Sequence, residues 1–151
     1  MGIEENKKIV KELVERMGEG DSSAIDELTT EDFVVRTMRN EYLELGKQAL
    51  MQTNDGGHVA FPDYSMTIDD MIAEGDKVFV LSTRRGTHEG EFNGIPPTGN
   101  KIKVYRFALY RLEGGKIAEM WALDDTLGQF QQLGLLPKIA EFIKAYNDSL
   151  K

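Results

Sequence analysis

The sequence has no cysteine among its 151 residues and only two histidines, His58 and His88. The lack of cysteine excludes disulfide bonds, thiolate nucleophiles and cysteine-ligated metal sites. Neither a His-x-His nor a His-Glu-x-x-His spacing occurs, and these spacings are typical of histidine-ligated metals. We therefore expect neither a metal site nor a cofactor.

Positive charge is also scarce, because 18 lysines and arginines face 26 acidic residues and the net charge is −8. Nucleic acids and anionic membranes bind positive surfaces, so we expect neither as a partner. The apolar runs are too short to span a bilayer. Residues 1–17 alternate charged with apolar side chains, unlike a secretory signal. These absences favour a cytoplasmic protein.

The composition that remains is that of one folded domain over residues 1–151. Hydrophobic residues make up 40% and charged residues 29%, the balance of a globular protein. Helical spacing of apolar residues occurs over 9–17, from Asp21 through Leu28, over 46–61 with a stop at Gly56 and Gly57, and over 137–151. Strand patterns occupy residues 31–38, 64–73, 77–90, 101–112 and 116–125.

The order of these elements predicts an α+β fold with segregated layers. Helices come first, and strands joined by tight turns such as Gly114-Gly115 follow. Consecutive hairpins imply a curved antiparallel sheet. Packed with the N-terminal helices, such a sheet forms a cone around an internal pocket that is open at one end.

Two stretches carry a resemblance to a known family: "GTHEGEFNGIPPTGNKIKV" and "GGKIAEMWALDDTLGQFQQLGLLP". With the region before them, residues 61–137 resemble the SnoaL-like polyketide cyclase (ester cyclase) family. The resemblance implies the cone of the nuclear transport factor 2-like superfamily, and a homodimer that packs sheet against sheet. It also implies cofactor-free closure of a ring by aldol condensation of a polyketide ester, with an aspartate in the pocket as general acid and base.

Two adjacent aspartates, Asp124 and Asp125, compete for that role. Side chains alternate across a strand, so both cannot face the pocket. In the resembling family the catalytic aspartate follows the tryptophan by four residues, which is the position of Asp125 after Trp121. We therefore expect Asp125 to face inward, and Asp124 to face outward or cap the helix that begins near Thr126. The alternative is that Asp125 is only a helix N-cap.

His88 and Arg106 are the other polar candidates. His88 ends a strand beside the Pro96-Pro97 loop, where it could assist Asp125 or orient a substrate carbonyl. Alternatively, it holds the loop by hydrogen bonds. Arg106 lies in mid-strand and needs a partner. The expected partner is Glu119 or Asp125 in an ion pair, or an anionic group of the substrate.

Four aromatic residues, Trp121, Phe92, Phe61 and Tyr64, are the expected pocket wall, although large aromatics often serve only as core. Together with the resemblance, they predict a small hydrophobic partner. The predicted function is cofactor-independent, aldol-type acid/base chemistry on a hydrophobic carbonyl compound or polyketide ester. The alternatives are a ligand-binding domain without turnover, and a proton-transfer isomerase or hydrolase on the same fold.

Overall fold

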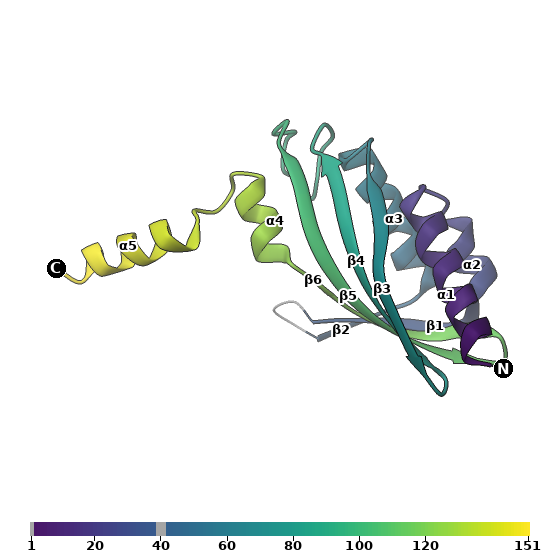
Figure 1. Ribbon diagram of the computed structural model, residues 1–151. Coiled ribbons are helices and arrows are strands. Elements are labelled where there is room, and N and C mark those ends of the chain that lie inside the picture. The colour runs from purple at the N-terminus through teal and green to yellow at the C-terminus, as the bar shows by residue number, and fades with distance from the viewer. Residues whose placement is uncertain (1, 39–41) are drawn as a thin grey trace.

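The computed structural model describes residues 2–38 and 42–151. Along the chain the elements are α1 (Ile3–Gly18), α2 (Ser23–Leu28), β1 (Thr29–Met38), β2 (Tyr42–Leu45), α3 (Lys47–Ala60), β3 (Ser65–Glu74), β4 (Lys77–Thr87), β5 (Lys101–Glu113), β6 (Lys116–Asp124), α4 (Thr126–Gln132) and α5 (Ile139–Ser149). Helices α1 to α3 lie on one side of a curved sheet (Figure 1).

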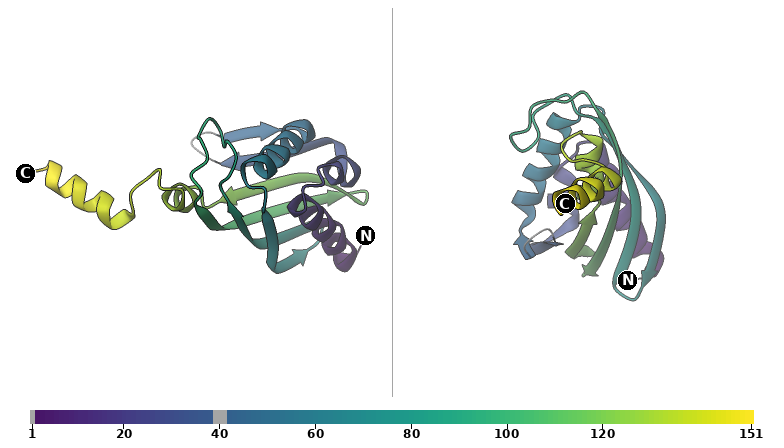
Figure 2. Two further views of the ribbon diagram at one scale, coloured as in Figure 1. Left: turned by 90° about the horizontal axis from the view of Figure 1, so that it is seen from above. Right: turned by 90° about the vertical axis from the view of Figure 1, so that its left-hand side faces the viewer.

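The six strands form one open sheet in the order β2-β1-β6-β5-β4-β3. All neighbouring pairs are antiparallel except β1 and β6, which run parallel. The sheet is therefore mixed. Its one parallel pair joins β1 to a strand about 85 residues later in the sequence, as parallel pairing requires a long connection between the strands. The α+β prediction with a curved sheet and N-terminal helices is confirmed (Figure 2), but the sheet is not the wholly antiparallel one that the sequence predicted, because β1 and β6 are parallel.

The core lies between the inner face of the sheet and helix α1. Val10 and Leu13 of α1 are fully buried, as are Val78 of β4 and Met120 of β6. Burial alternates along β4 and β5, which is the pattern of strands that turn one face to a core. A second, smaller cluster of buried residues forms around Phe61 and Val104.

Helix α3 continues past the pair at which the sequence predicts a stop. Gly56 and Gly57 lie inside the helix, which ends at Ala60. Glycine costs a helix only about 1 kcal/mol relative to alanine. The helix stops before Phe61, which directly precedes Pro62 and has a non-helical φ of −128° and ψ of 84°. The continuation carries His58 into the last helical turn, where its Nε2 lies 2.9 Å from the Met17 carbonyl oxygen.

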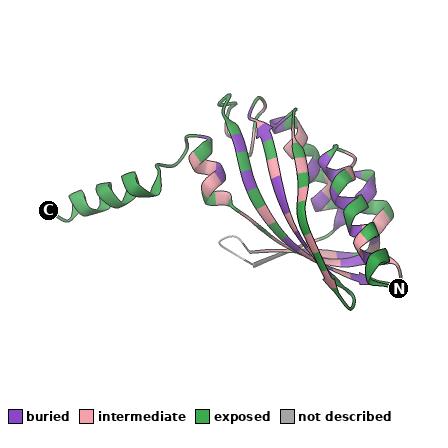
Figure 3. Ribbon diagram, in the orientation of Figure 1, coloured by how far each residue is buried: buried purple, intermediate pink, exposed green. Residues whose placement is uncertain are grey.

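Helix α5 extends away from the body of the protein (Figure 1), and none of its residues is buried (Figure 3). Among the described helices, none is both long enough and apolar enough to cross a membrane.

Candidate active site

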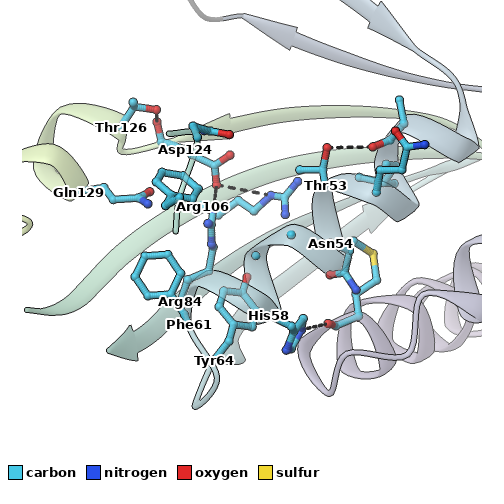
Figure 4. Close-up of a pocket in the computed structure, with 18 of the residues that line it drawn as sticks. Thr53, Asn54, His58, Phe61, Tyr64, Arg84, Arg106, Asp124, Thr126 and Gln129 are labelled. Atoms are coloured by element: carbon cyan, nitrogen blue, oxygen red, sulfur yellow. Dashed lines mark hydrogen bonds and ion pairs between the residues drawn. The ribbon is translucent and has the colours of Figure 1, made fainter. Parts of the chain in front are cut away.

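A pocket of about 570 Å³ opens between α3, α4 and the inner face of β4 to β6. Its walls combine apolar side chains with a polar group at one side. Leu50 and Phe61 contribute apolar surface, and Arg84, Arg106 and Asp124 contribute charge. Figure 4 shows the two arginines converging on Asp124.

Asp124, rather than Asp125, faces the pocket. Arg111 of β5 pairs with Glu119 of β6, but the next residue, Leu112, pairs with Ile117. Ala118 is therefore an extra residue, and such a β-bulge reverses the alternation of side chains beyond it. Met120 consequently points into the core, and Asp124 lies on the same face.

Asp125 caps helix α4. Its Oδ1 accepts a hydrogen bond from the Gly128 N–H at 2.9 Å, and the residue is exposed. Gly128 is required by this cap, because a Cβ at that position would lie 2.1 Å from the Asp125 Oδ2. The prediction that Asp125 faces the pocket is wrong, and the alternative of an N-cap describes its place.

Asp124 is held between two arginines from neighbouring strands. The Arg84 Nη1 contacts its Oδ1 directly, and the Arg106 Nε lies 3.7 Å from the same oxygen. The side chains of Arg106, Arg84 and Asp124 are 12%, 17% and 24% exposed. The Arg84 guanidinium also lies over the ring of Tyr64, 5.7 Å from its centroid.

The expected partners of Arg106 were Glu119 and Asp125, and neither is its partner. Glu119 lies beyond the bulge on the outer face of the sheet, where it binds the Arg111 Nε at 2.9 Å and also contacts Arg36. Burial alone lowers the pKa of Arg106, but the negative charge of Asp124, with contributions from Tyr110 and Tyr64, raises it above its ordinary value. Arg106 is therefore positively charged throughout the working pH range.

Comparison with known proteins agrees with this geometry. The family model of the SnoaL-like polyketide cyclases matches residues 7–133. The chain belongs to the SnoaL-like polyketide cyclase family. No match was found among curated proteins.

Several solved structures share the fold of this chain. AclR from Streptomyces galilaeus, a proposed hydroxylase, is 28% identical with a TM-score of 0.83, and the match covers 99% of this chain and 93% of AclR. IdmH from Streptomyces antibioticus, a proposed polyketide cyclase, is 26% identical with a TM-score of 0.75, over 85% of this chain and 98% of IdmH. A protein from Catenulispora acidiphila with a ketosteroid isomerase-like fold is 16% identical with a TM-score of 0.70, and the match covers 85% of this chain and 93% of that protein.

His88 supports the loop of this SnoaL-like domain and does not line the pocket. The residue is fully buried, and its Nδ1 lies 3.0 Å from the Thr98 Oγ1 and accepts the Thr98 N–H at 3.2 Å. Its backbone pairs with Asn100 and Gly99. Of the two interpretations of His88, the structure favours the one in which it fixes the Pro-Pro-Thr-Gly loop.

Three of the four predicted wall aromatics line the SnoaL-like pocket, namely Phe61, Tyr64 and Phe92. Trp121 does not, because the bulge at Ala118 places it on the outer face. There it is 36% exposed, with the Arg36 guanidinium 5.3 Å from its ring centroid. The prediction that Trp121 forms a cavity wall is wrong.

The sequence analysis missed several pocket residues. Arg84 and His58 line the pocket, and the sequence analysis assigned neither of them to it. Gln129 of α4 is buried and also lines the pocket. Arg106 lies opposite Asp124 in the β5–β6 ladder, so the register of this hairpin carried a signal for Arg106 but not for Arg84. In the part of the chain that the structure describes, no group of three or more His, Cys, Asp or Glu side chains is arranged to hold a metal ion.

Proposed function

We propose that this SnoaL-like protein is an enzyme that performs cofactor-independent, aldol-type acid/base chemistry on a hydrophobic carbonyl compound, with Asp124 as the general base and acid. The observation that carries the proposal is one carboxylate inside a mostly apolar pocket, held by two arginines of neighbouring strands. We assign this role to Asp124 instead of Asp125, because the Asp125 carboxylate accepts the capping hydrogen bond from the Gly128 N–H.

The Asp124 carboxylate lies in the pocket beside the two arginines, where its oxygens can reach a bound substrate. A carboxylate oxygen takes a proton from the carbon next to a substrate carbonyl, and the C–H electrons move to the carbonyl oxygen as an enolate. The enolate carbon then attacks a second carbonyl of the same molecule, and a C–C bond forms. The new alkoxide takes the proton back from Asp124, so the enzyme returns to its starting state.

The apolar wall suits a substrate with an aromatic or polyene body. Phe61 and Phe92 pack edge to face, with ring centroids 5.7 Å apart, beside the polar group. A pocket of about 570 Å³ lies within the range of about 300–1,000 Å³ that is typical of small-molecule sites.

Proton exchange at carbon tests the proposal without the natural substrate. A panel of aromatic β-diketones and β-keto esters is incubated with the protein in D₂O, and loss of the α-proton signal is followed by NMR. The proposal expects exchange faster than in buffer alone for at least one compound. Saturable binding of these compounds without any acceleration of exchange would instead support a ligand-binding domain.

We also propose that the protein is a homodimer that packs through the outer face of its sheet. Tyr105, Phe107 and Leu123 are 50%, 47% and 50% exposed there, and Phe107 pairs directly with Leu123 across the ladder. An exposed apolar patch of this kind marks an interaction surface.

Light scattering after size exclusion measures the assembly. We expect twice the 17.0 kDa mass of the chain for the wild type, and 17.0 kDa for Phe107→Glu. Val59→Glu, at a side chain on α3 that is 67% exposed, is the matched control and should remain a dimer. A wild-type mass of one chain at micromolar concentration would refute the dimer.

A further inference from the structure

The charges inside the pocket do not balance. Among the described side chains that line it, Arg84 and Arg106 contribute two positive charges and Asp124 contributes one negative charge at the polar wall. The other acidic lining residue, Glu91, is exposed to solvent. The described lining side chains thus leave one positive charge at this wall without a counter-charge, and a buried charge without a counter-charge is costly.

Hydrogen-bond donors are also in excess at this wall. The Nε of Arg84, the Nε of Arg106 and the Nε2 of Gln129 are all buried without a hydrogen-bond partner. The Arg106 Nε lies 3.7 Å from the nearest Asp124 oxygen, beyond hydrogen-bond range. Guanidinium groups donate only, so the ligand that completes this wall supplies acceptors and not donors.

We infer that the pocket recognises its substrate through a carboxylate that binds between Arg84 and Arg106, so that the substrate is a free aromatic keto acid and not its ester. The inference rests on the proposed function, because it names the substrate class of that same site. One substrate carboxylate brings the polar wall to two positive and two negative charges. Arginine binds a carboxylate through paired N–H donors, and Gln129 supplies a neutral donor beside them.

The matched probes are 3-hydroxy-2-naphthoate and its methyl ester, which differ at this group by one charge and one methyl. Their dissociation constants are measured by isothermal titration calorimetry against the full chain. The wild type should bind the acid at least about tenfold more tightly than the ester, as expected for a charge-assisted contact in a shielded site. Arg106→Met should remove that preference and leave the affinity for the ester within about twofold.

Arg85 provides the matched control, because it is the next residue of β4 and is exposed on the opposite face. Arg85→Met removes the same charge from the protein and should change neither affinity. An equal loss in Arg85→Met and Arg106→Met would show that net charge, and not the pocket, selects the acid, and would overturn the inference. Equal binding of acid and ester by the wild type would also overturn it.

Asp124→Asn gives a test of opposite sign that does not depend on Arg106→Met folding. Removal of the competing carboxylate frees both guanidinium groups, so this variant should bind the naphthoate more tightly than the wild type, by about threefold or more. Unchanged or weaker binding of the acid would contradict the inference. These measurements involve no turnover. A protein that prefers the acid but exchanges no α-proton would therefore refute the proposed function alone, and exchange without acid preference would refute this inference alone.

Discussion

Asp124→Asn should slow α-proton exchange by about three orders of magnitude, in line with the 10²–10⁴-fold contribution of a positioned general base. Asparagine has nearly the shape of aspartate but cannot accept a proton at neutral pH. The two arginines and the aromatic wall remain, so binding of the ester probe should change little. The measurement is the exchange rate constant in D₂O at saturating substrate.

Asp125→Asn is the control for this result. The two aspartates are adjacent, and the substitutions are chemically identical. Asparagine is as good an N-cap as aspartate, so the hydrogen bond to the Gly128 N–H can be kept. We expect an exchange rate within about twofold of the wild type, because Asp125 does not touch the pocket. A large loss in Asp125→Asn with little loss in Asp124→Asn would reverse the assignment.

The second large effect concerns stability. Asp124→Asn leaves the charges of Arg84 and Arg106 partly buried without their counter-charge. Breaking a fully buried pair costs about 3–5 kcal/mol. With the side chains 12–24% exposed, we expect a smaller loss of about 2 kcal/mol in the free energy of unfolding.

Combining this substitution with Arg84→Met should recover stability. The double variant keeps one arginine and no aspartate, so one uncompensated charge is removed and methionine fills the space. We expect it to be about 1 kcal/mol more stable than Asp124→Asn alone. Urea denaturation of the wild type, Asp124→Asn, Arg84→Met and the double variant measures the coupling energy between the two side chains. Additive losses, within about 0.5 kcal/mol, would mean that the contact between Arg84 and Asp124 contributes nothing.

The layers of the fold could be predicted because they depend on local periodicity. The apolar residues of α1 recur at helical spacing in the sequence, and those of β4 and β5 alternate with polar ones, as their alternating burial in the structure reflects. The parallel pairing of β1 with β6 joins distant segments, and no local pattern encodes it. The length of α3 was misjudged because its glycines weaken a helix without ending it.

The sequence analysis placed the catalytic carboxylate correctly in the Asp124-Asp125 pair, but it chose Asp125, whereas Asp124 lines the pocket. Simple alternation from Ile117 places Asp125 inward, and Ile117 is indeed buried. A single extra residue, Ala118, then inverts the faces, and this places both Trp121 and Asp125 outside the pocket. Bulges arise from pairing with a neighbouring strand, so the sequence of β6 alone carried no sign of it. The partner of Arg84 lies 40 residues away and was equally hidden.

Covalent labelling of the pocket carboxylate tests the central claim most directly. A carboxylate oxygen opens the ring of 2-(naphthalen-2-yl)oxirane to form a hydroxy ester, and the released alkoxide takes a proton from water. Fragmentation of the labelled peptide by mass spectrometry distinguishes Asp124 from Asp125. Our account predicts an ester on Asp124 that is lost in Asp124→Asn and suppressed by 3-hydroxy-2-naphthoate. An ester on Asp125, or no modification of either residue, would contradict it.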